Sequence, residues 1–233
     1  MVNKLRAILE PSGLHLRMEQ YERLEAYHTL LLEWNQRMDL TNVPPDEMPL
    51  RHYADSLLPL LRQDLFLQGA RLVDVGSGAG FPGLPLAIVR PDMEVVLLDS
   101  LKKRCLFLQT VVDTVGLANV RVLHGRAEDA ARGELRAVFD LAVARAVAPL
   151  RVLAEYLLPF AKVGGKAVCW KGPAAGEELN QAQNALKLLG GRADVPWMLP
   201  LQDQEHMLLT IHKTIATPNI YPRKAGTPGK KPL

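Results

Sequence analysis

The chain is predicted to be an α/β protein in which a doubly wound, mostly parallel sheet follows an N-terminal helical cap. Two observations predict this fold. From Ala70 onward, short apolar strands alternate with helical stretches, which is the pattern of parallel strands joined by crossover helices. The first strand runs into a glycine-rich turn and an apolar helix, which is how the ligand site of such a sheet begins. The 233 residues, 48% hydrophobic and 23% charged, suit one large domain with small additions.

Residues 1–68 are predicted to form the helical cap. Between residues 18 and 38, apolar side chains recur every three or four positions, which is the period of one helix face. Asn42 and Pro44-Pro45 should end this helix, and Asp46 is placed to cap a further helix through Leu61. The apolar positions of the first helix are Tyr21, Leu24, Tyr27, Leu31, Trp34 and Met38.

Residues 69–213 carry the alternating pattern of the sheet domain. Strands are expected at residues 71–75, 94–99, 120–123, 140–144, 166–171 and 206–213. Helices are expected at residues 83–90, 101–115, 127–132, 149–161 and 175–189. The last segment, residues 214–233, contains four prolines and is expected to be an irregular tail.

The glycine turn after the first strand points to a nucleotide-type ligand. Gly76, Gly78 and Gly80 let the backbone turn sharply and approach a ligand without a Cβ clash. Gly78, Gly80 and Gly83 also match the dinucleotide pattern G-x-G-x-x-G, which is weak by itself. Asp74 shifts the balance, because a carboxylate there repels a pyrophosphate and attracts a cation. S-adenosylmethionine is such a cation, and D-x-G-x-G-x-G is the usual opening of a Rossmann-like, class I S-adenosylmethionine-dependent methyltransferase. An ordinary glycine turn is the alternative.

Three further candidates follow strands at the same edge of the sheet, where doubly wound folds bind their ligands. Asp99 ends the second strand, where an acid accepts hydrogen bonds from a ribose; a helix cap is the alternative, although Ser100 could provide it. Glu128 follows the third strand and is placed to read adenine, the alternative being a solvated acid at a helix start. Arg145 ends the fourth strand, where we favour a contact with the cofactor or substrate over a structural ion pair.

A second group of polar residues precedes the glycine turn. His52, Asp55 and Ser56 fall on one side of a helix and are candidates for shaping the substrate pocket, although a locally hydrogen-bonded helix start explains them nearly as well. Lys171 ends the fifth strand and suits a phosphate or base contact, with a solvated lysine as the alternative. No metal site is expected, because one His beside one Asp does not provide enough ligands.

The absence of other catalytic motifs narrows the kind of methyl transfer. Cys105 lies in an apolar helix and Cys169 in a strand that looks buried, so neither resembles the activated thiol that pyrimidine carbon-5 methylation needs. The fourth strand ends in Ala-Arg-Ala-Val rather than the Asn/Asp-Pro-Pro-aromatic motif of exocyclic amine methylation. Guanine N7 fits what is left, because its lone pair is already nucleophilic. Elimination alone does not prove this target.

The surplus positive charge is concentrated at the C-terminus. The whole chain carries +3, and the residues from 213 onward carry five cations and no acid, which leaves residues 1–212 at −2. The cations Arg223, Lys224, Lys230 and Lys231 are candidates for RNA phosphate contacts, with a solvated end as the alternative. We expect a cytoplasmic monomer, because no apolar run approaches the ~20 residues of a membrane helix and no export signal precedes the cap.

The combination of motifs resembles one family, the bacterial ribosomal RNA small-subunit methyltransferase G family, formerly called glucose-inhibited division protein B. The resemblance runs from about Tyr27 to the C-terminus and is far more specific than any single motif. It is carried by Trp34-Asn35, Leu40-Thr41-Asn42, His52 with Asp55-Ser56-Leu57, Asp74 through Gly83, Asp99 through Arg104 with Phe107-Leu108, Arg126-Ala-Glu128, Arg145-Ala-Val147, Lys171-Gly172, Tyr221-Pro-Arg-Lys and Gly226-Thr-Pro228.

The resemblance implies S-adenosylmethionine-dependent N7 methylation of a guanine in the 530-loop region of 16S ribosomal RNA. The partner would be that RNA or the small ribosomal subunit. The resemblance also implies a rival role for the tail, in which Tyr221-Pro-Arg-Lys folds back over the crevice instead of contacting RNA. By motif, the cofactor contacts would be Gly76, Phe81, Ala127, Glu128 and Arg145, to which the residue-based argument adds Asp74, Gly78 and Asp99. The family motif supplies no established general base, and the catalytic residue stays unassigned, with Arg145, His52 and Asp55 as positioning candidates.

Two other classes of protein remain as alternatives. A nicotinamide-dependent oxidoreductase would use Gly78–Gly83 as its fingerprint, but it would leave Asp74 unexplained, and no Tyr-x-x-x-Lys pair is present. A non-catalytic ribosome-binding factor would keep the sheet as a relic. Methyl transfer from labelled cofactor to ribosomal RNA separates the second alternative from an enzyme.

Overall fold

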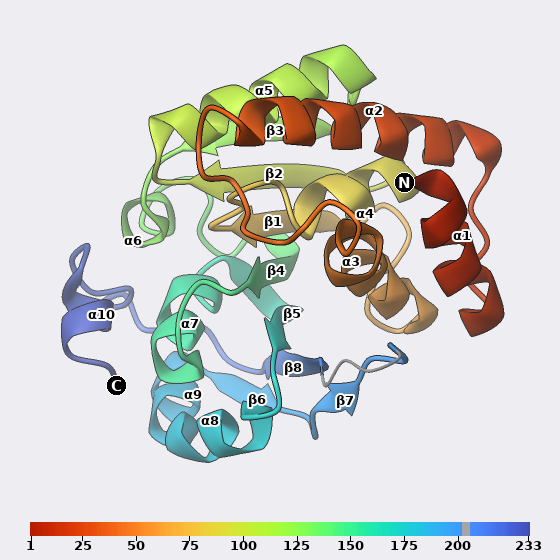
Figure 1. The fold of residues 1–233 in the computed structure, drawn as a ribbon. Coiled ribbons are helices and arrows are strands. Elements are labelled where there is room, and N and C mark those ends of the chain that lie inside the picture. Colours follow the sequence, from red (N-terminus) through yellow and green to blue (C-terminus); the bar gives the residue numbers. More distant parts are fainter. Residues whose placement is uncertain (202–205) are drawn as a thin grey trace.

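The computed structural model describes residues 1–201 and 206–233. Within them, eight strands form one sheet in the order β3-β2-β1-β4-β5-β8-β6, with β7 paired to β8 (Figure 1). Strands β1 to β5 run parallel, and β8 is antiparallel to β5. The order reverses at β1, where β2 and β4 lie on its two sides, so the carboxyl ends of these strands border the crevice that binds ligands in such sheets.

The strands of the sheet are β1 (Arg71–Val75), β2 (Glu94–Asp99), β3 (Val120–His124), β4 (Phe139–Arg145), β5 (Ala161–Lys171), β6 (Gly191–Ala193), β7 (Trp197–Met198) and β8 (Met207–Lys213). The α-helices are α1 (Val2–Leu9), α2 (Met18–Asn35), α3 (Asp55–Leu57), α4 (Gly83–Val89), α5 (Lys102–Val115), α6 (Ala127–Ala130), α7 (Leu150–Leu157), α8 (Ala175–Gln181), α9 (Gln183–Leu189) and α10 (Thr227–Lys230). The predicted fold class and the alternation of strands and helices are confirmed.

Several predicted boundaries are wrong for local reasons. Helix α2 ends at Asn35 rather than near residue 38, because the Asn35 side chain binds the backbone of Leu40 and Thr41 and turns the chain. The helix predicted from Asp46 is instead a π-helical turn at Pro49–Ala54, the short α3 and a 3-10 turn, and it has no side-chain cap. The helix predicted over 149–161 ends at Leu157, because Pro159 follows it.

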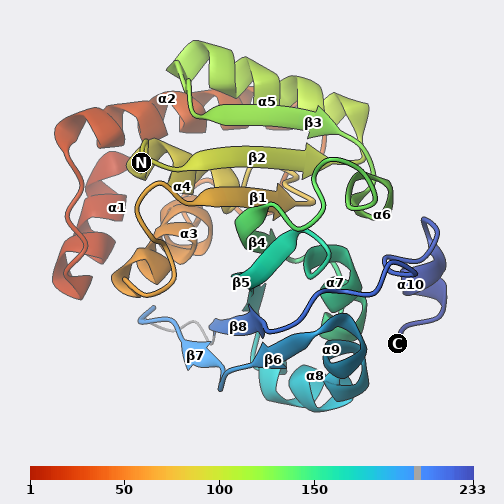
Figure 2. The same ribbon diagram turned by 180° about the vertical axis from the view of Figure 1, so that it is seen from behind.

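Other elements were not predicted because their sequences are short. Strands β6 and β7 carry too few residues for a periodic pattern, whereas α1 lies within the segment predicted to be helical, for which no bounds were predicted. The predicted helix over 175–189 is divided at Ala182 into α8 and α9. The tail is not irregular throughout, since α10 forms in it and packs beside α7 (Figure 2).

Two apolar cores cover the two faces of the sheet. On one face, residues such as Leu72 and Leu97 pack against helices α1 to α5. On the other face, residues such as Val73 and Ala142 pack against α7, α9 and the buried Tyr221 of the tail. Adjacent residues of β1 therefore belong to different cores, as the alternation of side chains along a strand requires. The N-terminal cap is thus part of one core of the sheet domain.

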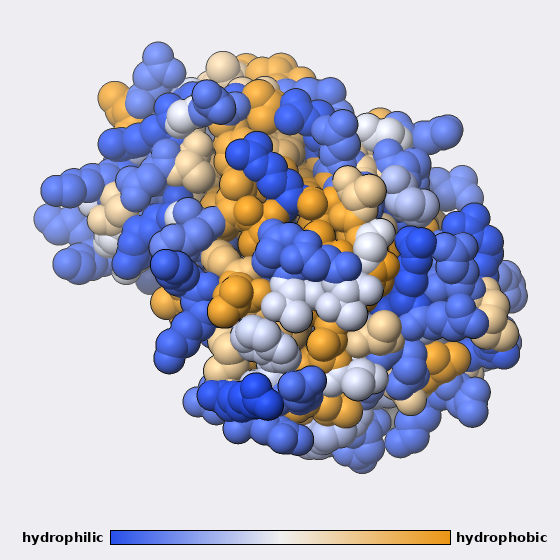
Figure 3. Space-filling view, turned by 90° about the horizontal axis from the view of Figure 1, so that it is seen from above, coloured by the Kyte–Doolittle hydropathy of each residue, from blue (hydrophilic) through white to orange (hydrophobic). Residues whose placement is uncertain are grey.

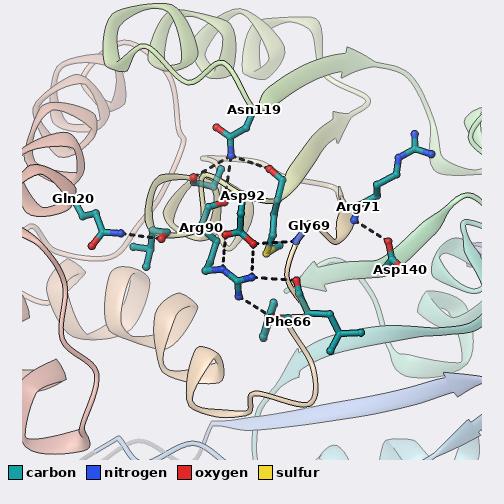
Figure 4. Close-up of polar contacts among 12 residues, drawn as sticks. Gln20, Phe66, Gly69, Arg71, Arg90, Asp92, Asn119 and Asp140 are labelled. Atoms are coloured by element: carbon teal, nitrogen blue, oxygen red, sulfur yellow. Dashed lines mark hydrogen bonds and ion pairs between the residues drawn. The ribbon is translucent and has the colours of Figure 1, made fainter.

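A polar cluster ties the cap to the amino-terminal edge of the sheet (Figure 4). Gln20 on α2 donates to the carbonyl of Val89 at the end of α4 (2.9 Å). Arg90 forms a two-bond ion pair with Asp92, and Asn119 donates to three carbonyls around the same turn. This cluster lies at the edge opposite the ligand crevice, so it fixes the fold without touching the candidate site.

No helix of the described residues is long and apolar enough to cross a membrane.

Candidate cofactor and substrate site

Two cavities lie side by side at the carboxyl edge of the parallel strands. The smaller, of about 230 Å³, is bordered by the ends of β1 and β2 and by the loop after β3. The larger, of about 520 Å³, is bordered by the ends of β4 and β5 and by the π-helical turn of the cap. Val147, in the loop after β4, lines both cavities. A ligand in each would therefore meet the other near this residue.

The glycine loop shapes the smaller cavity through close backbone approach. Gly76 has a positive φ of 75°, and a Cβ atom on it would come within 2.8 Å of the Val147 side chain. Gly80, with φ of 100°, lies so close to Leu84 and to the Tyr27 hydroxyl that a Cβ atom would clash with both. The Tyr27 hydroxyl donates to the carbonyl of Ala79, so the cap helix α2 holds the loop from behind. The loop therefore requires glycine for steric reasons at these two positions.

Asp74 lies beneath the glycine loop and is fully buried. Its Oδ2 accepts the N–H of Gly83 (2.9 Å), whereas its Oδ1 has no hydrogen-bond partner among the described residues. Burial raises the pKa of Asp74 to about 7, with the hydrogen bond from Gly83 and the charge of Arg145 opposing that rise. A buried acid with one unpaired oxygen would be stabilised by a nearby cation.

Asp99 organises the turn next to the smaller cavity. Its Oδ2 accepts the N–H of Gly78 (2.9 Å) and its Oδ1 accepts the N–H of Leu101 (2.8 Å). Both oxygens are thus engaged by backbone, and Arg104 lies 3.8 Å from Oδ2. Ser100, which lines the cavity, comes directly after this carboxylate. The predicted ribose contact of Asp99 stays a prediction, since an acceptor oxygen can take a second hydrogen bond.

Glu128 and Ala127 line the smaller cavity at the start of α6, as does Tyr156 of α7. Glu128 is buried, and its Oε1 accepts the N–H of Gly226 in the tail (2.8 Å). The tail therefore folds back to the rim of the smaller cavity and contacts a residue predicted to bind the cofactor. Figures 1 and 2 both show this end of the chain beside α6 and α7.

Arg145 joins the predicted positioning residues in one network. Its guanidinium donates to Asp55 Oδ2 (2.8 Å), to the carbonyl of Arg51 (3.0 Å) and to His52 Nδ1 (3.0 Å). It also lies over the ring of Phe81, 5.0 Å from the centroid, and His52 stacks on the same ring at 4.5 Å. Burial and the charge of Arg145 lower the pKa of His52 to about 3, so its imidazole is neutral at physiological pH.

Three members of this network were not among the predicted site residues. Thr41 contacts His52 Nε2 through its hydroxyl (2.7 Å), His206 contacts Asp55 Oδ1 (2.8 Å), and the indole of Trp170 donates to the Asp55 carbonyl (2.8 Å). Asp55 is fully buried and has both carboxylate oxygens engaged. Thr41 lies within a quoted family motif, whereas nothing in the sequence separates His206, 151 positions from Asp55, from an ordinary strand residue.

Ser56 fits the alternative interpretation, a locally hydrogen-bonded helical turn, rather than a role in the substrate pocket. Its hydroxyl donates to the carbonyl of His52 (2.6 Å) and it is buried, so it closes the local helical turn. Lys171 lies at the end of β5 and lines the larger cavity. It donates to the carbonyl of Ala148 and to Glu178, so it is not the freely solvated lysine of the alternative interpretation.

The tail is anchored by one of the four cations predicted to bind RNA. Arg223 forms a two-pronged ion pair with Glu155 of α7, whose side chain is fully buried, and the Arg223 N–H binds the same carboxylate. Its predicted role as a mobile phosphate contact therefore needs correction, because it serves to hold the tail. Lys224, Lys230 and Lys231 are exposed.

The two cysteines remain poor nucleophiles in the folded chain. Burial raises the pKa of Cys105, and burial raises the pKa of Cys169 to about 12. Among the described residues, no cluster of His, Cys, Asp and Glu is arranged to hold a metal ion.

Comparison with known proteins agrees with this arrangement. The fibrillarin of Aeropyrum pernix, solved in complex with natively bound S-adenosyl-L-methionine, superposes with a TM-score of 0.51 at 16% identity, covering 68% of this chain and 76% of that one. The sheet order, the glycine loop and this likeness define the fold of a class I S-adenosylmethionine-dependent methyltransferase.

The particular family follows from sequence. The family model described as rRNA small subunit methyltransferase G matches residues 20–205. Ribosomal RNA small subunit methyltransferase G of Alkaliphilus metalliredigens is 47% identical over 225 residues, covering 95% of this chain and 94% of that protein. The protein of the same name from Clostridium beijerinckii is 44% identical, covering 96% and 95%. The chain belongs to the ribosomal RNA small subunit methyltransferase G family, which confirms the resemblance and rules out the nicotinamide-dependent oxidoreductase.

Proposed function

We propose that the chain transfers a methyl group from S-adenosyl-L-methionine to N7 of a guanine in the 530-loop region of 16S ribosomal RNA. The observation that carries this proposal is the pair of adjacent cavities that share Val147. Three of the predicted cofactor residues, Gly76, Ala127 and Glu128, line the smaller cavity, whereas Arg145 lines the larger one and Asp74, Gly78, Phe81 and Asp99 line neither. The larger cavity offers no activated thiol for covalent attack on a base. Membership of a ribosomal RNA methyltransferase family supports the substrate class.

The residues around the smaller cavity fit the cofactor. The unpaired Oδ1 of Asp74 gives a cationic ligand a buried counter-charge beneath the loop. Gly76 has no side chain, so no Cβ atom fills the part of the cavity next to Val147. Ser100 and Ala127 lie where the ribose and adenine of a nucleoside are held in doubly wound folds. Asp74, Gly76, Gly78, Phe81, Asp99, Ala127, Glu128 and Arg145 remain the proposed cofactor residues.

The protein's task in this reaction is to position two reactants. S-adenosyl-L-methionine supplies an electrophilic methyl group on a positively charged sulfur, and guanine N7 offers a lone pair with no proton to remove. Holding such groups in line can contribute up to about 7–11 kcal/mol to the acceleration. Arg145, Asp55 and His52 are joined by hydrogen bonds and form one wall of the larger cavity. The reaction needs no proton acceptor from them. This is consistent with positioning roles for all three residues.

The proposed target must leave its helix to enter the larger cavity. The N7 edge of guanine faces the RNA major groove, which is too deep and narrow in A-form helices for protein to enter. The target guanine should therefore lie in a loop or be extruded from its stack. We expect labelled methyl transfer to 16S RNA, but none when the target loop is replaced by a fully paired stem. Equal rates on loop and stem would contradict the proposal.

The same assay separates an enzyme from a non-catalytic ribosome-binding factor, which would bind without transferring label. Naked 16S RNA, a precursor particle and the assembled small subunit should be tested side by side, because each presents the loop differently. A small-subunit substrate would put the reaction in the cytoplasm, and we propose that the protein acts as a monomer.

A further inference from the structure

The larger cavity contains an ion pair that the positioning network does not use. Lys171, at the end of β5, donates from Nζ to Glu178 Oε2 on α8 (2.7 Å) and to the carbonyl of Ala148 (2.8 Å). Both charged side chains line this cavity, and only 8% of the Lys171 and 27% of the Glu178 side chain is exposed. Neither residue lines the smaller cavity.

The pair is fixed in place but has unused hydrogen-bonding capacity. Glu178 Oε2 also accepts the N–H of Leu150 at the start of α7 (2.7 Å), which holds the carboxylate. Within residues 1–201 and 206–233, Glu178 Oε1 accepts no hydrogen bond, and Lys171 uses two of its three donors. By contrast, Asp55, the other carboxylate of this cavity, has both oxygens engaged. The larger cavity therefore presents one free donor beside one free acceptor.

Uracil offers this pair one acceptor and one donor, O4 and N3–H, whereas the Watson–Crick edge of guanine offers the carboxylate a second donor. That edge presents the O6 acceptor next to the N1–H and N2–H₂ donors, and N7 lies on the other side of O6. Adenine presents a donor and then an acceptor, which is the reverse order, and would place its N1 lone pair against the carboxylate. Enzymes that act on an extruded base commonly read it by hydrogen bonds to this edge.

We propose that Lys171 and Glu178 select guanine in the larger cavity, with Lys171 donating to O6 and Glu178 Oε1 accepting from N1–H and N2–H₂. The proposal rests on the proposed guanine-N7 methylation and adds the residues that choose the base. Reading this edge leaves N7 free to face the shared wall at Val147 and the smaller cavity.

Inosine tests the contact, because it keeps N1–H, O6 and N7 and lacks only the N2 amine. With the unaltered enzyme, kcat/KM should be roughly ten- to a hundredfold higher for RNA with guanosine at the target position than for RNA with inosine there. This ratio corresponds to the free energy of one hydrogen bond to a charged group. In Glu178→Gln the amide oxygen keeps the hydrogen bond from the Leu150 N–H. The amide nitrogen, which is a donor, then faces the N2 amine of the base in place of the acceptor oxygen. The preference for guanosine should then fall to less than threefold.

Glu177→Gln is the matched control, since Glu177 is the exposed neighbour on the same helix and should keep the full preference. Cofactor affinity of Glu178→Gln should match that of the control, because the contacts of Glu178 lie outside the smaller cavity. Equal rates on guanosine and inosine with the unaltered enzyme would overturn the proposal whatever the variant does, as would an undiminished preference in Glu178→Gln. No methyl transfer to guanosine RNA at all would instead refute the proposed function.

Discussion

Arg145 is the residue on which the wall of the larger cavity depends. It lies at the end of β4, donates to Asp55, His52 and the Arg51 carbonyl, and covers Phe81. Asp55 is fully buried, so its charge is tolerated only because Arg145 neutralises it and both Arg145 and His206 bind its carboxylate oxygens. The sequence interpretation set a functional role for Arg145 against a structural ion pair. The structure shows the ion pair, and the same side chain lines the cavity.

Replacing Arg145 should therefore affect stability and activity together. In Arg145→Gln, the buried Asp55 charge loses its main partner, and we expect the free energy of unfolding to fall by about 3 kcal/mol. Methyl transfer should fall as well, because His52 and Asp55 lose their common anchor. Urea unfolding and kcat/KM measure the two effects. Arg51→Gln is the control: its ion pair with Glu47 is exposed and contributes less than about 1 kcal/mol. Equal stability of the two variants would contradict this account.

The raised pKa of Asp74 predicts how the free energy of unfolding depends on pH. Burial raises its pKa to about 7, so the folded chain holds this proton more tightly than the unfolded chain does. Stability must then fall as the pH rises from about 4 to about 7, by up to about 1.4 kcal/mol for each pH unit. Asp74→Asn cannot ionise, so its unfolding free energy, measured in urea between pH 5 and 8, should fall less steeply. Excess S-adenosylmethionine should also flatten the slope of the unaltered protein, if the cation meets Asp74. Parallel profiles of the two proteins would exclude a raised pKa.

Single residues were predictable where they follow a strand of the parallel sheet. Such positions converge on one edge, so Asp99, Glu128 and Arg145 could be placed near the crevice from sequence. His206 and Trp170 could not, because they reach Asp55 only through the pairing of β8 with β5 and the docking of the cap. The detailed geometry of Asp74 also escaped prediction: a carboxylate suited to a cation was expected, but not one bound to the backbone of its own loop.

At the scale of elements, the cap and the sheet depend on a polar cluster rather than on apolar packing alone. Asn119, before β3, donates from Nδ2 to the carbonyls of Ala87 (3.2 Å), Arg90 (3.4 Å) and Met93 (3.0 Å). These carbonyls belong to the end of α4 and the turn into β2, and the Arg90 carbonyl also accepts the Met93 N–H. Asn119 thus joins the start of β3 to the end of α4 and the turn into β2 (Figure 4).

Asn119→Ala should destabilise the fold without altering the site. Removing the amide leaves three partly buried carbonyls without this donor, and we expect a loss of about 1–3 kcal/mol in urea unfolding. Cofactor affinity, measured by calorimetry on the folded protein, should be unchanged, because the cluster lies at the opposite edge of the sheet. Asn180→Ala, at an exposed position of α8, should leave both quantities unchanged. A large loss of cofactor affinity in Asn119→Ala alone would mean that this edge is coupled to the crevice.

Elements were predictable in proportion to their length and periodicity. The strands of the parallel sheet are apolar runs between clear turn signals, so their positions were correct to within a few residues, apart from the early start of β5 at Ala161. The turns of residues 49–61 combine π, α and 3-10 geometry around Pro49 and Pro59, which no single helical period describes. Strands β6 and β7 exist only because β8 offers an edge to pair with.

At the scale of the whole molecule, the cap helices and the C-terminal tail lie on opposite faces of the sheet. Figure 3, which looks onto the side of α2 and α5, shows a band of apolar side chains between polar margins. Leu101, directly before α5, and Leu106 of α5 are among the exposed apolar residues of the chain. The tail lies on the other face of the sheet, where Arg132 and Arg136 hold its carbonyls and Glu128 binds Gly226. The sequence left this open, since the charges and prolines of the tail are equally typical of a solvated end, and only the family resemblance suggested a tail folded back over the crevice.

The tail should consequently divide into an anchor and an RNA-binding part. Arg223→Gln leaves the buried Glu155 without its partner, so we expect a loss of stability of about 3 kcal/mol and, through the contact of Gly226 with Glu128, weaker cofactor binding. Replacing Lys224, Lys230 and Lys231 together by Gln should leave stability and cofactor affinity unchanged, because all three are exposed.

The triple lysine variant should instead weaken RNA binding in a salt-dependent way. Each lysine that contacts a phosphate contributes about 0.7–0.9 to the slope of log affinity against log salt, so the slope should flatten by up to about three such increments. Phosphate contacts position RNA without reading its sequence, so the Michaelis constant for RNA should rise while the preference for the target guanine is kept. RNA affinity at two salt concentrations, for the parent and the variant, measures this. An unchanged affinity and slope would show that the exposed lysines do not touch RNA and that the tail acts only through its anchor on α6 and α7.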